Sequence, residues 1–152
     1  MYDRIRRLLT APEEPAMDRD DLQAAVAVLL LKAARTDGIF DHHERATIEH
    51  LLQRKFQLSQ ATVKQLLWEA EETIKRPHEL PPFARVAVEH MEPQRLVHLI
   101  EMLWEVAFAD DKLDPGEETL LHRVAGLTGV GDSECESAKH RVLRWLQQKH
   151  NR

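Results

Sequence analysis

The feature that most limits how this chain can fold is an acidic turn that occurs twice, 73 residues apart. The first copy, DGIFDHHE, runs from Asp37 to Glu44, and the second, DDKLDPGE, runs from Asp110 to Glu117. Both follow the pattern D-x-x-h-D-x-x-E, where h is a large apolar residue, and the matched acids keep one offset (110 − 37 = 117 − 44 = 73). The sequence therefore predicts two similar helical units, each built around one cluster of carboxylates.

The composition indicates one folded domain that does not bind nucleic acid. A chain of 152 residues can bury a substantial core, and 43% apolar with 31% charged residues is ordinary for a helical protein. The net charge is −5 and the basic residues are scattered, so no basic stripe is present to neutralise phosphates. The single cysteine, Cys135, fits a reducing compartment.

The N-terminal region predicts neither a signal peptide nor a membrane span. Residues 1–9 contain no apolar h-region, and the longest apolar run, Ala24 to Leu31, has eight residues where a membrane span needs roughly 20. We therefore expect a cytoplasmic protein. Residues 1–17 are predicted to be a short basic helix and a linker. Packing of that helix on the core is favoured over the alternative, peripheral association with an anionic membrane surface.

Apolar periodicity predicts an all-α fold, because no stretch alternates with period two for long enough to indicate a strand. Residues 18–150 are expected to form a single domain of seven or eight helices. Three helices fall in each of two units, 18–77 and 91–150, and we expect internal pseudo-two-fold symmetry between the units. Ala24 to Leu31 is apolar on all sides, which predicts a buried central helix.

Helix capping accounts for part of the acidic pattern. Asp41 fits an N-cap and Glu44 the third helical position, from which glutamate reaches back to the N–H of the cap, and the second turn repeats this arrangement. Capping does not explain Asp37 and Asp110, which end the preceding helices, where an acid opposes the helix dipole. The alternative is a hard-cation site, since three carboxylates per turn suit Ca²⁺, Mg²⁺ or Mn²⁺. The residues alone favour capping and leave both interpretations open.

The candidate metal ligands are the matched acids of the two turns, Asp37, Asp41, Glu44, Asp110, Asp114 and Glu117. The spacing is not that of an EF-hand. The histidines are interpreted as solvated. Asp132 is predicted to cap the last helix, Cys135 to be partly buried and inert, and the three tryptophans, Trp68, Trp104 and Trp145, to lie in the core.

Two segments resemble the TerB-like, tellurite-resistance-associated family of helical proteins, over roughly residues 18–150. They are AARTDG at 33–38 with Glu44 after it, and AFADD at 107–111 with Glu117 after it. The resemblance implies an all-α fold of paired helical units, a role in stress response or as a scaffold near the membrane, and metal binding by the acids at 37, 44, 110 and 117. Gly38 has Asp111 as its counterpart, so the second turn departs from the pattern and equivalence of the two sites stays open.

The function favoured by these observations is a non-enzymatic stress-response binding or scaffold module. Its acidic turns would hold a divalent cation or a basic protein partner, and we expect no other cofactor, no catalytic residue and no nucleic acid ligand. The alternatives are a metal-assisted hydrolase and a pure protein-assembly domain. Carboxylates that line a substrate-sized pocket would favour the hydrolase.

Overall fold

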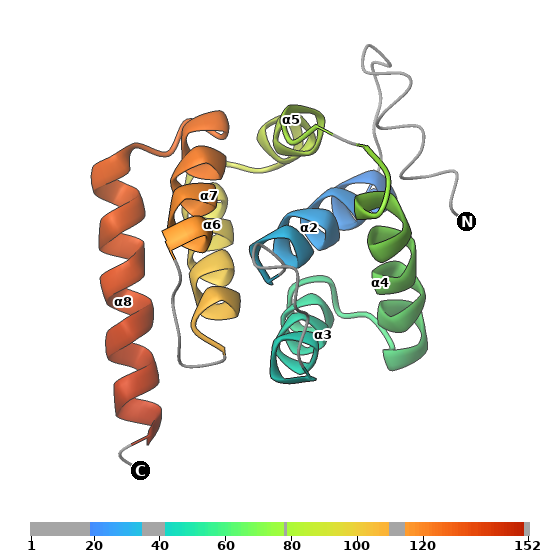
Figure 1. Ribbon diagram of the computed structural model, residues 1–152, viewed down its shortest axis with the longest axis horizontal. Coiled ribbons are helices and arrows are strands. Elements are labelled where there is room, and N and C mark those ends of the chain that lie inside the picture. The colour runs from blue at the N-terminus through green and yellow to red at the C-terminus, as the bar shows by residue number, and fades with distance from the viewer. Residues whose placement is uncertain (1–18, 35–41, 78, 110–114, 151–152) are drawn as a thin grey trace.

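The computed structural model describes residues 19–34, 42–77, 79–109 and 115–150, which form seven helices and no strand. The predicted all-α fold is confirmed, while the expected helix and linker of residues 1–17 lie outside the described residues. The helices (Figure 1) are α2 (Arg19–Ala34), α3 (His42–Phe56), α4 (Gln60–Ile74), α5 (Pro81–His90), α6 (Pro93–Ala107), α7 (Pro115–Leu127) and α8 (Asp132–His150).

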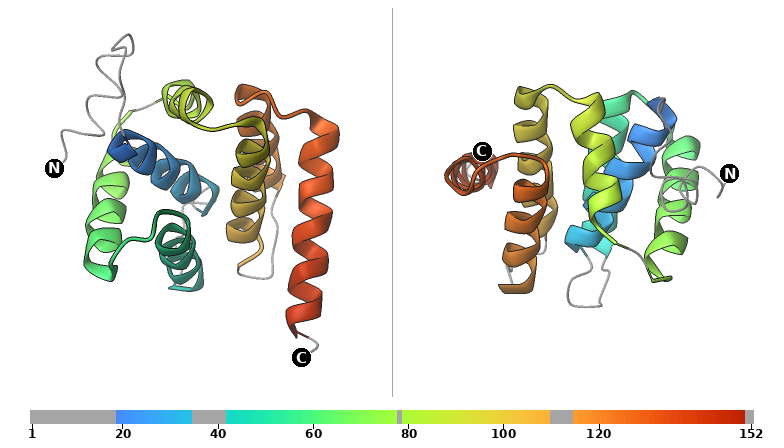
Figure 2. Two further views of the ribbon diagram at one scale, coloured as in Figure 1. Left: turned by 180° about the vertical axis from the view of Figure 1, so that it is seen from behind. Right: turned by 90° about the horizontal axis from the view of Figure 1, so that it is seen from above.

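Helix α2 is the centre of the domain, as its apolar run predicts. Every residue from Ala24 to Leu31 is fully buried. The helix contacts α3, α4, α5, α6 and α7, so helices of both units cover it. Figures 1 and 2 show α2 in the middle of the domain, with α4 and α8 at opposite ends of the long axis.

The packing pattern of the first unit recurs in the second. Helix α2 contacts α3 and α4, which contact each other, and α6 likewise contacts α7 and α8, which contact each other. Helices α2 and α6 end at residues 34 and 107, and α3 and α7 begin at residues 42 and 115, which are again offsets of 73. The two-fold axis itself stays a prediction.

Local chemistry sets several helix boundaries. The Ser59 Oγ accepts a hydrogen bond from the Thr62 N–H at 3.2 Å, as expected of an N-cap. Pro81 and Pro93 occupy the first positions of α5 and α6, where a missing N–H costs nothing.

The end of α7 is set by Gly129, whose φ of +82° is the left-handed conformation that glycine adopts without strain. The Val130 N–H donates to the Ala125 carbonyl at 2.8 Å, and the Gly129 N–H donates to the Gly126 carbonyl at 3.2 Å. These two bonds are those of a Schellman motif, and the buried Val130 side chain closes it. The motif turns the chain from α7 into α8.

The prediction that all three tryptophans lie in the core is right for one and wrong for two. Trp104 is fully buried, whereas Trp68 is 50% exposed and Trp145 is 41% exposed. Both exposed rings lie on the end helices α4 and α8, which bury one face each. On α4 that face is made by Val63, Leu66, Leu67 and Ala70, and position 68 points away from it.

Candidate functional site

Glu44 and Glu117 occupy the third positions of α3 and α7, as the capping interpretation predicts. Each of these glutamates is only 4% exposed, and each interacts with other groups of the protein. The remaining predicted ligands, Asp37, Asp41, Asp110 and Asp114, lie outside the described residues. The structure thus places one acid of each turn, and it buries both.

Burial distinguishes these two glutamates from ordinary capping residues. A carboxylate taken out of water is costly unless positive charge or hydrogen bonds replace its hydration. The positive end of a helix supplies part of that compensation at both positions. Matched burial at equivalent positions indicates that Glu44 and Glu117 face the interior of the domain at the base of their acidic turns.

Neither Glu44 nor Glu117 lines either of two pockets that described residues form. The first encloses about 290 Å³ between α3, α6 and α8 and is lined by Leu51, Arg54, His98, Glu101, Met102, Glu105, Arg141, Val142 and Trp145. The second encloses about 360 Å³ and is lined by Lys32, Glu79, Leu80, Pro81, Leu120 and Arg123. These two pockets therefore give the hydrolase hypothesis no support from Glu44 or Glu117.

The first pocket contains the polar stripe of α6. The Arg141 Nε donates to Glu101 Oε2 at 2.6 Å, and the Nδ1 of His98 lies 3.2 Å from Glu101 Oε1. Burial raises the pKa of the Glu105 carboxyl above its usual range, and the positive charge of Arg54 and Lys149 only partly opposes this. The pocket thus holds one carboxylate that is paired and one whose charged form is disfavoured.

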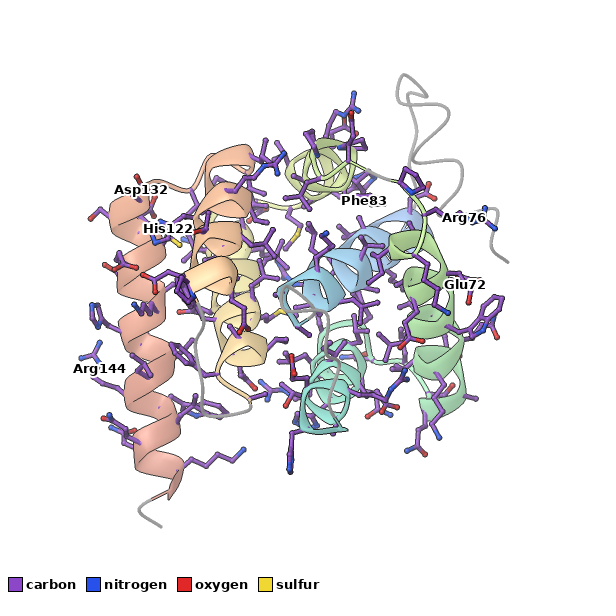
Figure 3. The ribbon with its side chains drawn as sticks, in the orientation of Figure 1. Glu72, Arg76, Phe83, His122, Asp132 and Arg144 are labelled. Carbon is purple, nitrogen blue, oxygen red and sulfur yellow. The ribbon has the colours of Figure 1, made fainter. Side chains whose placement is uncertain are left out.

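A third group of polar side chains lies where α7 packs against α8, and sequence reasoning missed it. His122 Nδ1 lies 3.2 Å from Asp132 Oδ1, and His122 Nε2 lies 3.2 Å from Glu136 Oε2. Figure 3 shows His122 and Asp132 at the same end of the helix pair. His122 is therefore not a solvated histidine, and Asp132 is the first residue of α8 with His122 as a partner, instead of the expected cap.

Sequence comparison decides the family. A family model described as Tellurite resistance protein TerB matches residues 23–140. The chain belongs to the TerB family. In the same comparisons, no curated protein and no solved structure matches. Membership confirms the resemblance and places the chain among the non-enzymatic, tellurite-resistance-associated helical domains. The match spans both acidic turns and the side chains around His122.

The only cysteine of this TerB domain is built into its core. Cys135 is fully buried, and burial raises the pKa of its thiol, an effect that the carboxylates of Glu136, Asp132 and Glu118 reinforce. Cys135 is thus buried more completely than the sequence predicted. A raised thiol pKa disfavours the nucleophilic thiolate, in agreement with the expectation that Cys135 is inert.

None of the helices described for this TerB domain combines the length and the apolar character that crossing a membrane requires.

Proposed function

We propose that this TerB domain is a cytoplasmic, non-enzymatic binding module whose two acidic turns each hold a hard divalent cation, Ca²⁺, Mg²⁺ or Mn²⁺. The observation that carries the proposal is the matched burial of Glu44 and Glu117, each 4% exposed at the third position of its helix. Sequence places further acids directly before each of these helices, namely Asp37, Asp41, Asp110 and Asp114.

The density of negative charge in each acidic turn favours a divalent cation. Within seven residues of chain, two further carboxylates precede Glu44 and three precede Glu117. The helix end supplies only about half an elementary positive charge. A divalent cation with oxygen ligands matches the remaining negative charge and the ligand chemistry of the turn. A basic protein partner is the alternative ligand for the same acids, and its binding would weaken with salt.

Thermal unfolding tests the cation proposal. The wild type is measured with a chelator and then with Ca²⁺, Mg²⁺ or Mn²⁺. A cation that binds only the folded state, present at 100 times its dissociation constant, adds about 2.7 kcal/mol of stability. The variants are Glu44→Gln and Glu117→Gln, singly and together. Glutamine can still serve the capping box, so stability in chelator should stay close to that of the wild type, whereas the response to cation should be lost.

The matched control is Glu134→Gln, which changes an exposed glutamate in the first turn of α8. It should keep the full response. If no cation raises the wild-type midpoint by more than about one degree, the cation proposal fails and the acidic turns are to be tested for a basic partner. A second pair, Asp37→Asn with Asp110→Asn, extends the test to the first acid of each turn, which follows the last residue of α2 or α6 by three positions. In chelator it should be neutral or slightly stabilising.

A further inference from the structure

Four side chains meet between α7 and α8, and none of them lines either of the two pockets described above. Glu118 and His122 lie four residues apart on α7, and Asp132 and Glu136 lie four residues apart on α8, so each pair shares one face of its helix. The His122 side chain is 28% exposed, and its ring forms a T-shaped contact with the buried Trp104 ring, with centroids 6.2 Å apart and an angle of 82° between the planes. The imidazole is therefore held in place between the two helices.

The imidazole lies between two carboxylates. Nδ1 of His122 lies 3.2 Å from an oxygen of Asp132, and Nε2 lies 3.2 Å from an oxygen of Glu136. A neutral ring has one N–H and one bare nitrogen. When Nδ1 carries the hydrogen and donates it to Asp132, the bare Nε2 lies beside the carboxylate of Glu136, where one cation can bind to both.

The distances fit a metal ion. One ligand atom each from Glu118, His122 and Glu136 can be chosen so that all three lie within 4.8 Å of one another. A tetrahedral zinc ion with bonds of 2.0–2.2 Å separates its ligand atoms by about 3.4 Å. The Nε2 of His122 and the Oε2 of Glu136, 3.2 Å apart, already have nearly that spacing. Glu118 supplies the third ligand atom, within 4.8 Å of the other two.

We propose that Glu118, His122 and Glu136 form a binding site for a zinc-class divalent cation. Asp132 is not a ligand in this arrangement. It accepts from the Nδ1–H of His122, which fixes the tautomer and leaves Nε2 free to bind the ion, as carboxylates commonly do behind metal-bound histidines. One imidazole and two carboxylates suit Zn²⁺, whereas Ca²⁺ and Mg²⁺ prefer sets made of oxygen alone. The site is thus chemically distinct from the acidic turns.

Lys139 is the internal competitor of the cation. Its Nζ lies 3.5 Å from Glu118 Oε1 and 5.4 Å from the centre of the Trp104 ring. A metal ion bound to Glu118 replaces this ammonium as the partner of the carboxylate, and the indole face keeps a place for the lysine. Because the three ligands come from two helices, the bound ion links α7 to α8.

Calorimetric titration of the full chain with Zn²⁺, after treatment with chelator, tests the proposal. The wild type should bind one ion at this site, and Zn²⁺ should raise its unfolding midpoint by more than about 3 °C. His122→Gln and Glu136→Gln should each weaken this binding by at least about tenfold, and Asp132→Asn should weaken it by about 10- to 100-fold. Lys139→Met should tighten it, because the competing ammonium is gone. Circular dichroism establishes that each variant is folded.

The matched control is His98→Gln. His98 also lies 3.2 Å from a carboxylate, that of Glu101, but among the described residues it belongs to no group of three converging ligands. It should leave zinc affinity unchanged. Equal zinc binding by the wild type and His122→Gln would overturn the proposal, and so would zinc binding that Glu44→Gln and Glu117→Gln abolish while His122→Gln does not. The Ca²⁺ and Mg²⁺ responses of the acidic turns are measured separately, so either proposal can fail alone.

Discussion

The indole N–H of Trp104 donates a hydrogen bond to the backbone carbonyl of Cys135 at 3.1 Å, across 31 residues of sequence. Both residues are fully buried, so the bond joins the last turn of α6 to the first turn of α8 in a dry environment. Trp104→Phe keeps an aromatic ring but removes the donor and leaves a buried carbonyl with one partner fewer. We expect a loss of about 1–3 kcal/mol in the free energy of unfolding, measured with denaturant.

Trp145→Phe is the control for that measurement, because Trp145 is 41% exposed. Its free energy of unfolding should stay within about 0.5 kcal/mol of the wild type. Similar losses in the two variants would show that the ring, and not the hydrogen bond to Cys135, carries the stabilisation.

Glu69 lies on α4 and is 1% exposed, and neither of its carboxylate oxygens has a hydrogen-bond partner among the described residues. Burying such a group without a partner costs roughly 1–3 kcal/mol. Glu69→Met, similar in shape and apolar, should therefore raise the free energy of unfolding, by up to that amount. The exposed Glu89 provides the control, Glu89→Met, which should change stability little. A loss of stability in Glu69→Met would contradict the prediction.

Glu105 makes stability depend on pH in a defined direction. Burial raises the pKa of its carboxyl, so the folded protein holds this proton more tightly than the unfolded chain. Its stabilising contribution is then complete below the unfolded pKa and is lost as pH rises through the folded pKa. Glu105→Gln, which cannot ionise, should be more stable than the wild type at neutral pH. The difference in unfolding midpoint should shrink as pH falls below the ordinary glutamate range, and a constant difference would refute the effect.

Two glycines near the end of α7 should respond to alanine with opposite signs. A Cβ added at Gly126 or at Gly129 meets no atom within 4 Å, so crowding affects neither substitution. Gly126 lies within the helix, where alanine is favoured by about 0.5–1 kcal/mol. Gly129 has a φ of +82°, which costs an L-residue roughly 1–2 kcal/mol. Chemical denaturation should show Gly126→Ala stabilised and Gly129→Ala destabilised, and equal signs would exclude this explanation.

Local sequence signals predicted most of the fold. The apolar run from Ala24 to Leu31 predicted the central helix. Ser59, Pro93 and Gly129 set helix boundaries in the structure, and each acts through its own backbone or its nearest neighbours. The exposure of Trp68 and Trp145 was not predicted. Apolar periodicity identifies a helix that has a buried side, but it does not reveal how much of the outer face another helix covers.

In the candidate sites, too, local features were predicted from the sequence and features that depend on packing between helices were not. The repeat predicted Glu44 and Glu117 at third helical positions, but their burial depends on packing far along the chain. The group around His122 was missed because its ligands come from two helices that meet through the turn at Gly129. The available signal was a pair of four-residue spacings, Glu118 to His122 and Asp132 to Glu136, on helices joined by a short glycine-containing connection.

The position of α2 has a consequence for dividing the chain. Its apolar surface is covered by α3, α4 and α5, and also by α6 and α7 from the second unit. A fragment that stops at Met91 would therefore expose apolar surface of α2 to water and should precipitate. A fragment that starts at Glu92 would lack α2, against which α6 packs. When the two fragments are produced together, they should reassociate into one folded domain, as the fragments of a split reporter protein do.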